Sequence, residues 1–292
     1  MAILLALLAS TAWGTVDFLG GLASRRANPI AVTFTSEAIA LILLVPATLI
    51  VGGDPSATDL GLGLIAGVGA ALALTLFYRA LAVGRMSVVA PITGATTATV
   101  PVVAGVILGE RPGPLAIVGI VGALLAIAFV SAGSEHELND PVPPTRHPVG
   151  SHLRPLRLGE VPLSIMCGAL FGSFLVLIHQ TGDHSGLWPL AASFLGGVLA
   201  VTVLSRATSS PLVTPRVVAP MMVTAGTLSA GGGVLYVVAT RSGLLSVVAV
   251  LSSLYPAVTV GLALVVLHER FGRVQTVGLG LAVISVVLLG TG

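Results

Sequence analysis

Charge is scarce in this sequence, and lysine is absent from it altogether. Only 8% of the 292 residues are charged, whereas 55% are hydrophobic and the mean hydropathy is +1.06. A soluble domain carries roughly 25% charged residues, so this chain lacks the charge to cover a water-exposed surface of its size. Lipid is therefore the expected solvent for most of the exterior. The net charge of only +2 gives no reason to expect a nucleic-acid partner.

Several site-forming patterns are also missing. The lone Cys167 excludes an internal disulfide. No phosphate-binding Walker pattern occurs, so ATP is not the expected energy source and we expect no cofactor. His136, His147 and His152 do not have the spacing of a standard metal site, so we expect no metal and interpret them as solvated side chains.

Long apolar runs separated by polar breaks predict an all-α membrane protein with ten transmembrane helices. A helix needs about 20 apolar residues to cross the bilayer. Ile39–Val51 and Val277–Leu289 are apolar on nearly every side, unlike the alternating strands of a barrel. Met1–Leu8 is apolar from the start and contains no basic n-region, which argues against a cleaved signal and favours a retained first helix. The predicted spans are residues 2–21, 30–51, 60–82, 87–108, 114–133, 160–180, 187–205, 217–239, 244–267 and 274–291.

Residues 134–158 differ from the rest in being rich in proline and charge, and they predict an exposed linker. The linker divides the chain into two five-helix repeats, residues 1–133 and 159–292. Gly84–Val130 aligns without a gap on Gly243–Leu289, so that Glu110-Arg111 falls on Glu269-Arg270. An odd number of spans per repeat places the two copies in opposite orientations. Inverted repeats are typical of secondary transporters, with the site near the midplane between them; the other explanation is duplication of a membrane scaffold that transports nothing.

The order of short motifs resembles the EamA-type transporters of the drug/metabolite transporter superfamily. The resemblance rests on Phe77-Tyr78-x-Ala80-Leu81, Ser87–Ala90 and Gly109-Glu110-Arg111 in the first half. In the second half it rests on Ser246–Ala249, Tyr255-Pro256 and Leu267-His268-Glu269-Arg270. It implies ten helices in two inverted bundles around a central cavity, and transport, often export, of metabolites or drugs. The chain departs from relatives in carrying Ser36-Glu37 where an Arg is frequent, which weakens the transfer of a substrate-binding charge to that place.

Arginine is distributed unevenly between the two sides of the predicted bundle. Under a ten-helix topology, all of the loop arginines except Arg111 and Arg241 fall on the side of the linker. The positive-inside rule then places the linker in the cytoplasm and both termini outside the plasma membrane. The resemblance argues for the opposite orientation, and we follow the charge count.

Two acidic residues lie inside apolar spans, Asp17 in the first and Glu37 in the second. A charge at mid-bilayer costs roughly 2.5–3.5 kcal/mol on insertion scales, so such residues usually face the interior and pair or bind. With Arg79 they predict a cluster that serves proton coupling or a charged part of a solute. The alternatives are a structural ion pair or side chains that extend to the headgroups.

Hydroxyl groups beside prolines mark spans 87–108 and 244–267 as further cavity candidates. Thr93 aligns with Ser252 and Thr96 with Tyr255, and Ser253 lies between them. These groups are suited to an uncharged polar or amphipathic solute, or else they hold helices together. Trp13 is a further candidate for the cavity, although the stripe of small residues beside it is more typical of packing than of a pore wall. Gly231-Gly232-Gly233 is a hinge or a close crossing, and we interpret Glu110 and Glu269 as anchors that cap the helix following each.

These observations predict a secondary transporter that moves a small metabolite or drug-like solute, by export, through alternating access of two inverted repeats. Proton-coupled uptake is the alternative within transport, with Glu37 and Asp17 as the coupling groups. A membrane enzyme acting on a lipid-linked substrate is the alternative of another class, although no metal or phosphate motif surrounds the acids. The expected partners are the solute, the lipid bilayer and protons, with the chain a monomer or a homodimer.

Overall fold

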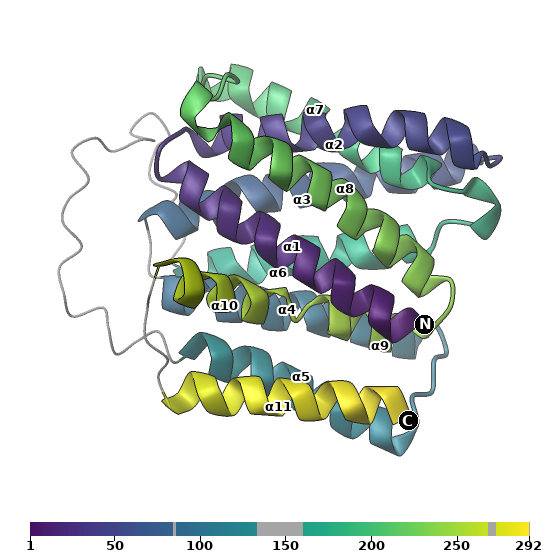
Figure 1. Cartoon of the computed structure of the whole chain (residues 1–292). Coiled ribbons are helices and arrows are strands. Elements are labelled where there is room, and N and C mark those ends of the chain that lie inside the picture. The colour runs from purple at the N-terminus through teal and green to yellow at the C-terminus, as the bar shows by residue number, and fades with distance from the viewer. Residues whose placement is uncertain (84–85, 133–159, 268–272, 292) are drawn as a thin grey trace.

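A computed structural model describes residues 1–83, 86–132, 160–267 and 273–291, and these residues form a bundle of helices without a strand (Figure 1). The predicted linker, 134–158, and Glu269 lie outside the described residues. The helices are α1 (Ala2–Ser24), α2 (Pro29–Val51), α3 (Ala57–Val83), α4 (Met86–Ile107), α5 (Pro114–Ala132), α6 (Glu160–His179), α7 (Trp188–Thr208), α8 (Ala219–Thr240), α9 (Leu245–Ser252), α10 (Tyr255–Leu267) and α11 (Arg273–Thr291). Two short 3-10 turns, η2 (Asp183–Ser185) and η3 (Arg216–Val218), precede α7 and α8.

Six of the helices are long and apolar enough to cross a membrane: α1, α2, α3, α6, α7 and α8. Four shorter apolar stretches, Ile92–Ile107, Pro114–Phe129, Leu245–Thr259 and Thr276–Leu289, accompany them. Large apolar side chains face outward, such as Ile50 at 85% and Ile107 at 78% exposure. Such a surface is stable in lipid rather than in water, and the chain is a multi-pass membrane protein.

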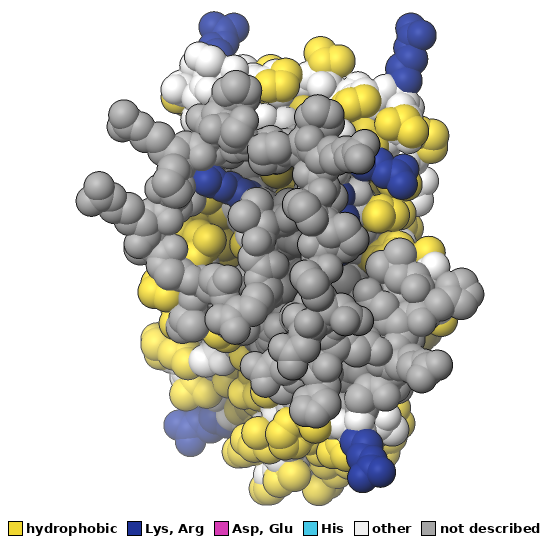
Figure 2. Space-filling model, turned by 90° about the vertical axis from the view of Figure 1, so that its left-hand side faces the viewer, with side chains coloured by type: hydrophobic (Ala, Val, Ile, Leu, Met, Phe, Trp, Pro, Cys, Tyr) yellow, Lys and Arg dark blue, Asp and Glu magenta, His cyan; other side chains and the backbone are white. Residues whose placement is uncertain are grey.

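Both chain termini lie at one end of the bundle, which we call the terminal end, whereas α5 ends and α6 begins at the opposite end, the linker end (Figure 1). Figure 2 looks onto the linker end and shows Arg side chains around its rim, with no acidic side chain visible in this view. Arg25, Arg26, Arg206, Arg216 and Arg273 belong to the helix ends that lie there. The uneven distribution of arginine is thus present in the folded chain.

The start of α2 shows how the sequence sets a helix boundary. The Asn28 side chain accepts a hydrogen bond of 2.9 Å from the Ile30 N–H, and Pro29 occupies the first turn, where a missing N–H costs nothing. The helix ends at Gly52, whose φ of +76° is a conformation that favours glycine. These signals fix the length of a span that buries Glu37 at mid-helix.

The single span predicted at 244–267 is wrong in one respect, because it is broken into α9 and α10 at Ser253–Leu254. Pro256 has no N–H, so the helical bond that it would donate to the Ser252 carbonyl is absent. The chain tightens there instead, with Leu254 N–H bonded to the Leu251 carbonyl at 3.3 Å and Ala257 N–H to the Leu254 carbonyl at 3.0 Å. The break places three residues with hydroxyl groups, Ser252, Ser253 and Tyr255, in the interior of the bundle.

Close helix crossings join the two halves. On α3, a methyl group added to Gly67 would lie 1.7 Å from the Ser193 carbonyl oxygen of α7, and one on Gly196 of α7 would lie 2.4 Å from the Leu64 carbonyl oxygen. The backbones meet because neither glycine has a side chain, as in other membrane helix pairs. Gly232 and Gly233 of α8 are likewise covered, by Trp13 and Leu190. At Gly232 and Gly233 the structure supports a close crossing, whereas a methyl group on Gly231 would have no described atom within 4 Å.

The same contacts recur in the two halves in exchanged form. Gly14 of α1 packs on Tyr255 and Val258 of α10, and its counterpart Gly172 of α6 packs on Thr97 and Val100 of α4. The first helix of each half therefore packs against the fourth membrane segment of the other half: α1 against α10, and α6 against α4. The two halves enclose the space between them.

Candidate functional site

A cavity lies between the two halves, with walls supplied by both. Its volume is about 110 Å³. The lining residues from the first half are Trp13, Val16, Asp17, Glu37, Gly67, Ala70, Leu74 and Thr97; those from the second half are Phe171, Phe174, Leu175, Ser193, Phe194, Ser229, Gly233, Ser252, Ser253 and Tyr255.

The Asp17 carboxylate enters the cavity from α1. The residue is 9% exposed, and the glycines on the same helix bring α1 close to its neighbours, with Tyr78 packed over Gly20. The Tyr78 side chain interacts electrostatically with both Asp17 and Glu37. The two acids, which are 20 positions apart in sequence, thus share one environment.

Glu37 reaches the cavity from α2, where it is 8% exposed. Its carboxylate lies over Gly197 of α7, since a methyl group at Gly197 would be 2.4 Å from Glu37 Oε2 and 3.1 Å from the Ala71 side chain. Gly197 therefore leaves the room that the carboxylate occupies. An acid of the first half is in this way held against a helix of the second.

Neither acid has a charge partner among the residues that the structure describes. Within the described part of the chain, Asp17 and Glu37 make no ion pair and no hydrogen bond, and no Arg or His lines the cavity. Arg79, predicted to join them, is absent from the lining. Two buried carboxyl groups without partners are neutralised either by protons or by a bound cation, because the charged form is costly in such surroundings.

The break between α9 and α10 adds hydroxyl groups to the wall. Ser252 and Ser253 are buried, and their hydroxyl oxygens have no hydrogen-bond partner among the described residues. The Tyr255 hydroxyl lies beside Thr97 without a hydrogen bond of ordinary geometry. Buried polar groups are normally paired, so these groups are available to a guest molecule.

The structure places Thr93 and Thr96 elsewhere. The Thr93 hydroxyl donates to the Ser164 carbonyl of α6 at 3.3 Å, and the Thr96 hydroxyl donates to the Ile92 carbonyl at 2.7 Å, within its own helix. Both residues face Gly168 of α6. They take the packing role that was the alternative for these hydroxyls, while Thr97, one position further, lines the cavity.

Aromatic rings form much of the remaining wall. The Trp13 ring meets Phe174 edge to face, with centroids 6.5 Å apart, and tilts against Tyr236 at 5.6 Å. Sequence reasoning singled out Trp13 and missed Phe171 and Phe174. The repeat offered a signal for the first, because Phe171-Gly172 aligns with Trp13-Gly14.

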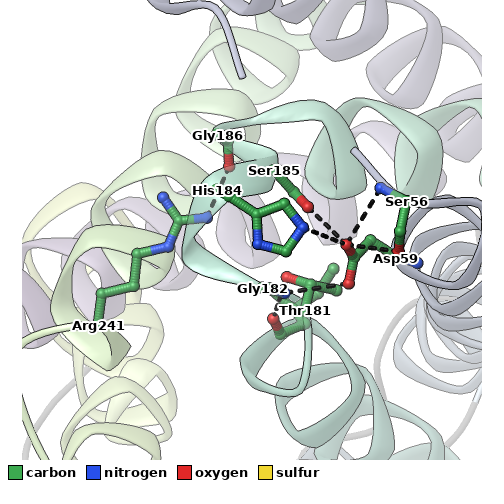
Figure 3. A network of polar contacts seen from close by, with 9 residues as sticks. Ser56, Asp59, Thr181, Gly182, His184, Ser185, Gly186 and Arg241 are labelled. Carbon is green, nitrogen blue, oxygen red and sulfur yellow. Dashed lines mark hydrogen bonds and ion pairs between the residues drawn. The ribbon is translucent and has the colours of Figure 1, made fainter. Parts of the chain in front are cut away.

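A polar network closes the terminal end of the bundle (Figure 3). The Asp59 carboxylate, in the first turn of α3, accepts hydrogen bonds from the Ser185 hydroxyl at 2.6 Å and the Gly182 N–H at 3.0 Å. It also accepts one from the Ser56 hydroxyl at 2.8 Å and lies 3.5 Å from His184 Nε2. We call these five residues the Asp59 network; it joins the first half to the loop between α6 and α7.

Arg241, which follows α8, extends the closure of this end. Its guanidinium donates to the Gly186 carbonyl at 2.8 Å and lies 3.2 Å from the Asp183 carboxylate. The Glu110 carboxylate accepts the backbone N–H groups of Leu245 and Ser246. The expectation that Glu110 caps the helix following it is therefore wrong: it caps α9, in the other half of the chain.

The comparisons with known proteins agree with this architecture. The model of the EamA-like transporter family matches residues 1–132 and 160–291. One crystal structure of a protein superposes with a TM-score of 0.74, covering 98% of this chain and 95% of that chain at 16% sequence identity, which shows the fold alone. A search of curated proteins found no significant match. The family match confirms the resemblance found in the sequence, and the chain belongs to the EamA-like transporter family of membrane proteins that transport small solutes.

Proposed function

We propose that the chain is a secondary transporter that exports a small metabolite or drug-like solute by alternating access of its two halves. In this proposal α9 and α10 together form one broken membrane segment, and the bundle has ten segments in two inverted repeats, residues 1–133 and 159–292. The cavity is the binding site, with Trp13, Asp17, Glu37 and the hydroxyls at the α9–α10 break as contacts. The oligomeric state, monomer or homodimer, stays a prediction.

One observation carries the proposal: the cavity is built from both halves, and helices of the two halves cross at glycines. Movement of one half against the other would change access to the cavity without unfolding a helix, which is the expected behaviour of inverted repeats. The Asp59 network and the Glu110 cap support this further. They join the halves at the terminal end, so release of the solute to that side requires those contacts to break.

Proton coupling is a second candidate, favoured by the two acids, for which the described residues supply no ion-pair partner. A carboxyl group in an apolar cavity can exchange a proton for a solute, or carry both together. The charged and titratable groups near it are few: Tyr78 from α3 interacts with both acids, and Tyr255 from α10 interacts with Asp17 and with Cys167 of α6. Export by exchange and uptake by cotransport differ in the direction in which a pH gradient drives the solute.

We further propose that the linker lies in the cytoplasm and both termini lie outside the plasma membrane. The arginines at the linker end support this orientation by the positive-inside rule. A reporter enzyme that is active only outside the cytoplasm, fused after Gly292, is expected to be active. An active reporter inserted at Gly150 instead would reverse the orientation.

Flux measurements on the full chain in proteoliposomes test the transport proposal. A panel of labelled amines, amino acids, sugars and organic acids is offered with a pH gradient imposed in each direction. We expect at least one solute to move faster than in empty vesicles, with accumulation when the interior is acidic for exchange, or when the exterior is acidic for cotransport. Absence of flux for the whole panel, with conversion of a lipid-linked substrate, would favour the membrane enzyme.

The role of Glu37 is tested by substitution in the same vesicles. Glu37→Gln keeps the size of the side chain and removes its titration, so we expect pH-driven flux to fall by more than about tenfold. Asp54→Asn is the matched control because Asp54 is an exposed acid at the terminal end. Unchanged pH-driven flux in Glu37→Gln would remove Glu37 from the coupling mechanism.

A further inference from the structure

The charged side chains on the wall of the cavity have a single sign. Asp17 and Glu37 line it, whereas no Arg and no His does so among the residues that the structure describes. A guest with a negative charge would be repelled by both carboxylates at short range in a medium that screens little. A zwitterion would find an opposite charge for its ammonium group and no positive side chain for its carboxylate. A positive charge is the one that this wall can neutralise.

The aromatic rings favour the same guest. Trp13, Phe171, Phe174 and Tyr255 present ring systems to the cavity, and the faces of such rings attract cations. The same rings offer apolar area to the body of the guest. A small hydrated inorganic ion would use neither property, so the cation that fits carries an apolar body.

The unpartnered hydroxyls at the helix break supply short-range polar contacts. Ser252 and Ser253 are fully or almost fully buried, at 0% and 1% exposure, and their hydroxyl oxygens have no partner in the described part of the chain. Pro256 also leaves the carbonyl of Ser252 without its usual helical donor. These oxygens are acceptors that an ammonium group, or the positive edge of an organic cation, can satisfy.

From these observations we propose that the solute is an amphipathic organic cation, whose charge is neutralised by Asp17 and Glu37 and whose apolar body lies against the aromatic wall. The inference rests on the proposed transport function for its physiological meaning, and on the cavity alone for binding. It replaces the uncharged solute suggested by the hydroxyls in the sequence.

Binding of two probes of equal shape and opposite charge tests the proposal directly. Tetraphenylphosphonium and tetraphenylborate are titrated into the purified full chain in a neutral detergent, and saturable binding is measured by calorimetry. We expect the cation to bind more than about tenfold tighter than the anion, a difference of at least about 1.4 kcal/mol. Equal binding of the two, or tighter binding of the anion, overturns the proposal. This comparison needs no variant, so it decides even where a substitution prevents folding.

Substitutions then locate the charge. Asp17→Asn and Glu37→Gln are each expected to weaken binding of tetraphenylphosphonium by more than about tenfold, whereas Asp54→Asn, which removes an exposed acid, is expected to leave it unchanged. Binding that is insensitive to both cavity variants would place the cation elsewhere and overturn the assignment.

The flux assay separates this inference from the transport proposal. If neutral or anionic solutes are transported while tetraphenylphosphonium neither binds nor moves, transport stands and the cationic class is wrong. If tetraphenylphosphonium binds through the two carboxylates and no solute of the panel moves, the site stands and the transport proposal is wrong.

Discussion

The carboxylate of Glu110, just after α4, caps the first residues of α9 by accepting the backbone N–H of Leu245 and, at 3.0 Å, that of Ser246. Leu245 and Ser246 follow Glu110 by 135 and 136 positions in the sequence, and they belong to the other half of the chain. An acidic side chain at a helix N-terminus satisfies orphan donors and complements the helix dipole. The short helix α9 is thus anchored by the opposite repeat.

Removing this cap is expected to destabilise the chain. Glu110→Ala leaves two N–H groups of α9 without an acceptor, and losses of N-caps cost about 0.5–2 kcal/mol. The midpoint of thermal unfolding in detergent should fall by several degrees, and Glu110→Gln, which retains an acceptor oxygen, should fall less. Asp54→Asn is the control, since Asp54 is an exposed acid at the same end. If the Glu110→Ala variant has the same unfolding midpoint as the unaltered chain, the cap contributes nothing to stability.

Asp59 is expected to control access to the cavity from the terminal end. Asp59→Ala removes the acceptor of the Ser185 hydroxyl, the Gly182 N–H and the Ser56 hydroxyl. The contact between α3 and the loop before α7 then weakens, and conformations open at this end become more populated.

A cysteine on the cavity wall reports that opening. In a Cys167→Ala background, Ser229→Cys introduces one thiol into the lining. We expect a membrane-impermeant maleimide applied from the side of the termini to label it several-fold faster when Asp59→Ala is added. Asp54→Asn, at the same end, should leave the rate unchanged, and an unchanged rate in Asp59→Ala would exclude the network as a closure.

Much of the fold follows from the sequence because apolar length and polar breaks fix where helices begin and end. The helices α2, α6 and α8 begin and end within a few residues of the predicted spans 30–51, 160–180 and 217–239. The break at Ser253 was not foreseen. Proline within a membrane helix is tolerated in many ways, so Pro256 alone does not say whether the helix kinks or divides.

The site was harder to predict, since its contacts join residues that are distant in the sequence. Asp17 and Glu37 are conspicuous as acids in apolar spans, and they do line the cavity. Asp59 stands next to a predicted helix start, where an acid is ordinary, and its partners Gly182 and Ser185 lie more than 120 positions away. Thr93 and Thr97 are both threonines of one helix, and which of them faces the cavity depends on the packing of α6.

The glycines offer a matched pair of substitutions. A methyl group on Gly67 would lie 1.7 Å from the Ser193 carbonyl oxygen, a backbone atom that cannot rotate away, whereas one on Gly231 has no described atom within 4 Å. Gly67→Ala is therefore expected to force α3 and α7 apart, with a loss of thermal stability and of monodisperse protein. Gly231→Ala should be neutral, or stabilising by up to about 1 kcal/mol through helix propensity. If the two variants melt alike, the close crossing of α3 and α7 is wrong.

Tyr78 and Tyr236 occupy equivalent places in the two halves and differ in one distance. The Tyr236 hydroxyl donates to the Leu175 carbonyl of α6 at 2.8 Å, whereas the Tyr78 hydroxyl lies 3.4 Å from the Val16 carbonyl of α1. A hydrogen bond contributes about 0.5–1.5 kcal/mol, and the contribution falls as the contact lengthens. Tyr236→Phe is therefore expected to lower the unfolding midpoint in detergent more than Tyr78→Phe does, although both substitutions remove one buried hydroxyl. Because the two changes are chemically identical, their difference reports the contact between helices rather than the loss of the group, and a larger effect at Tyr78 would contradict the distances.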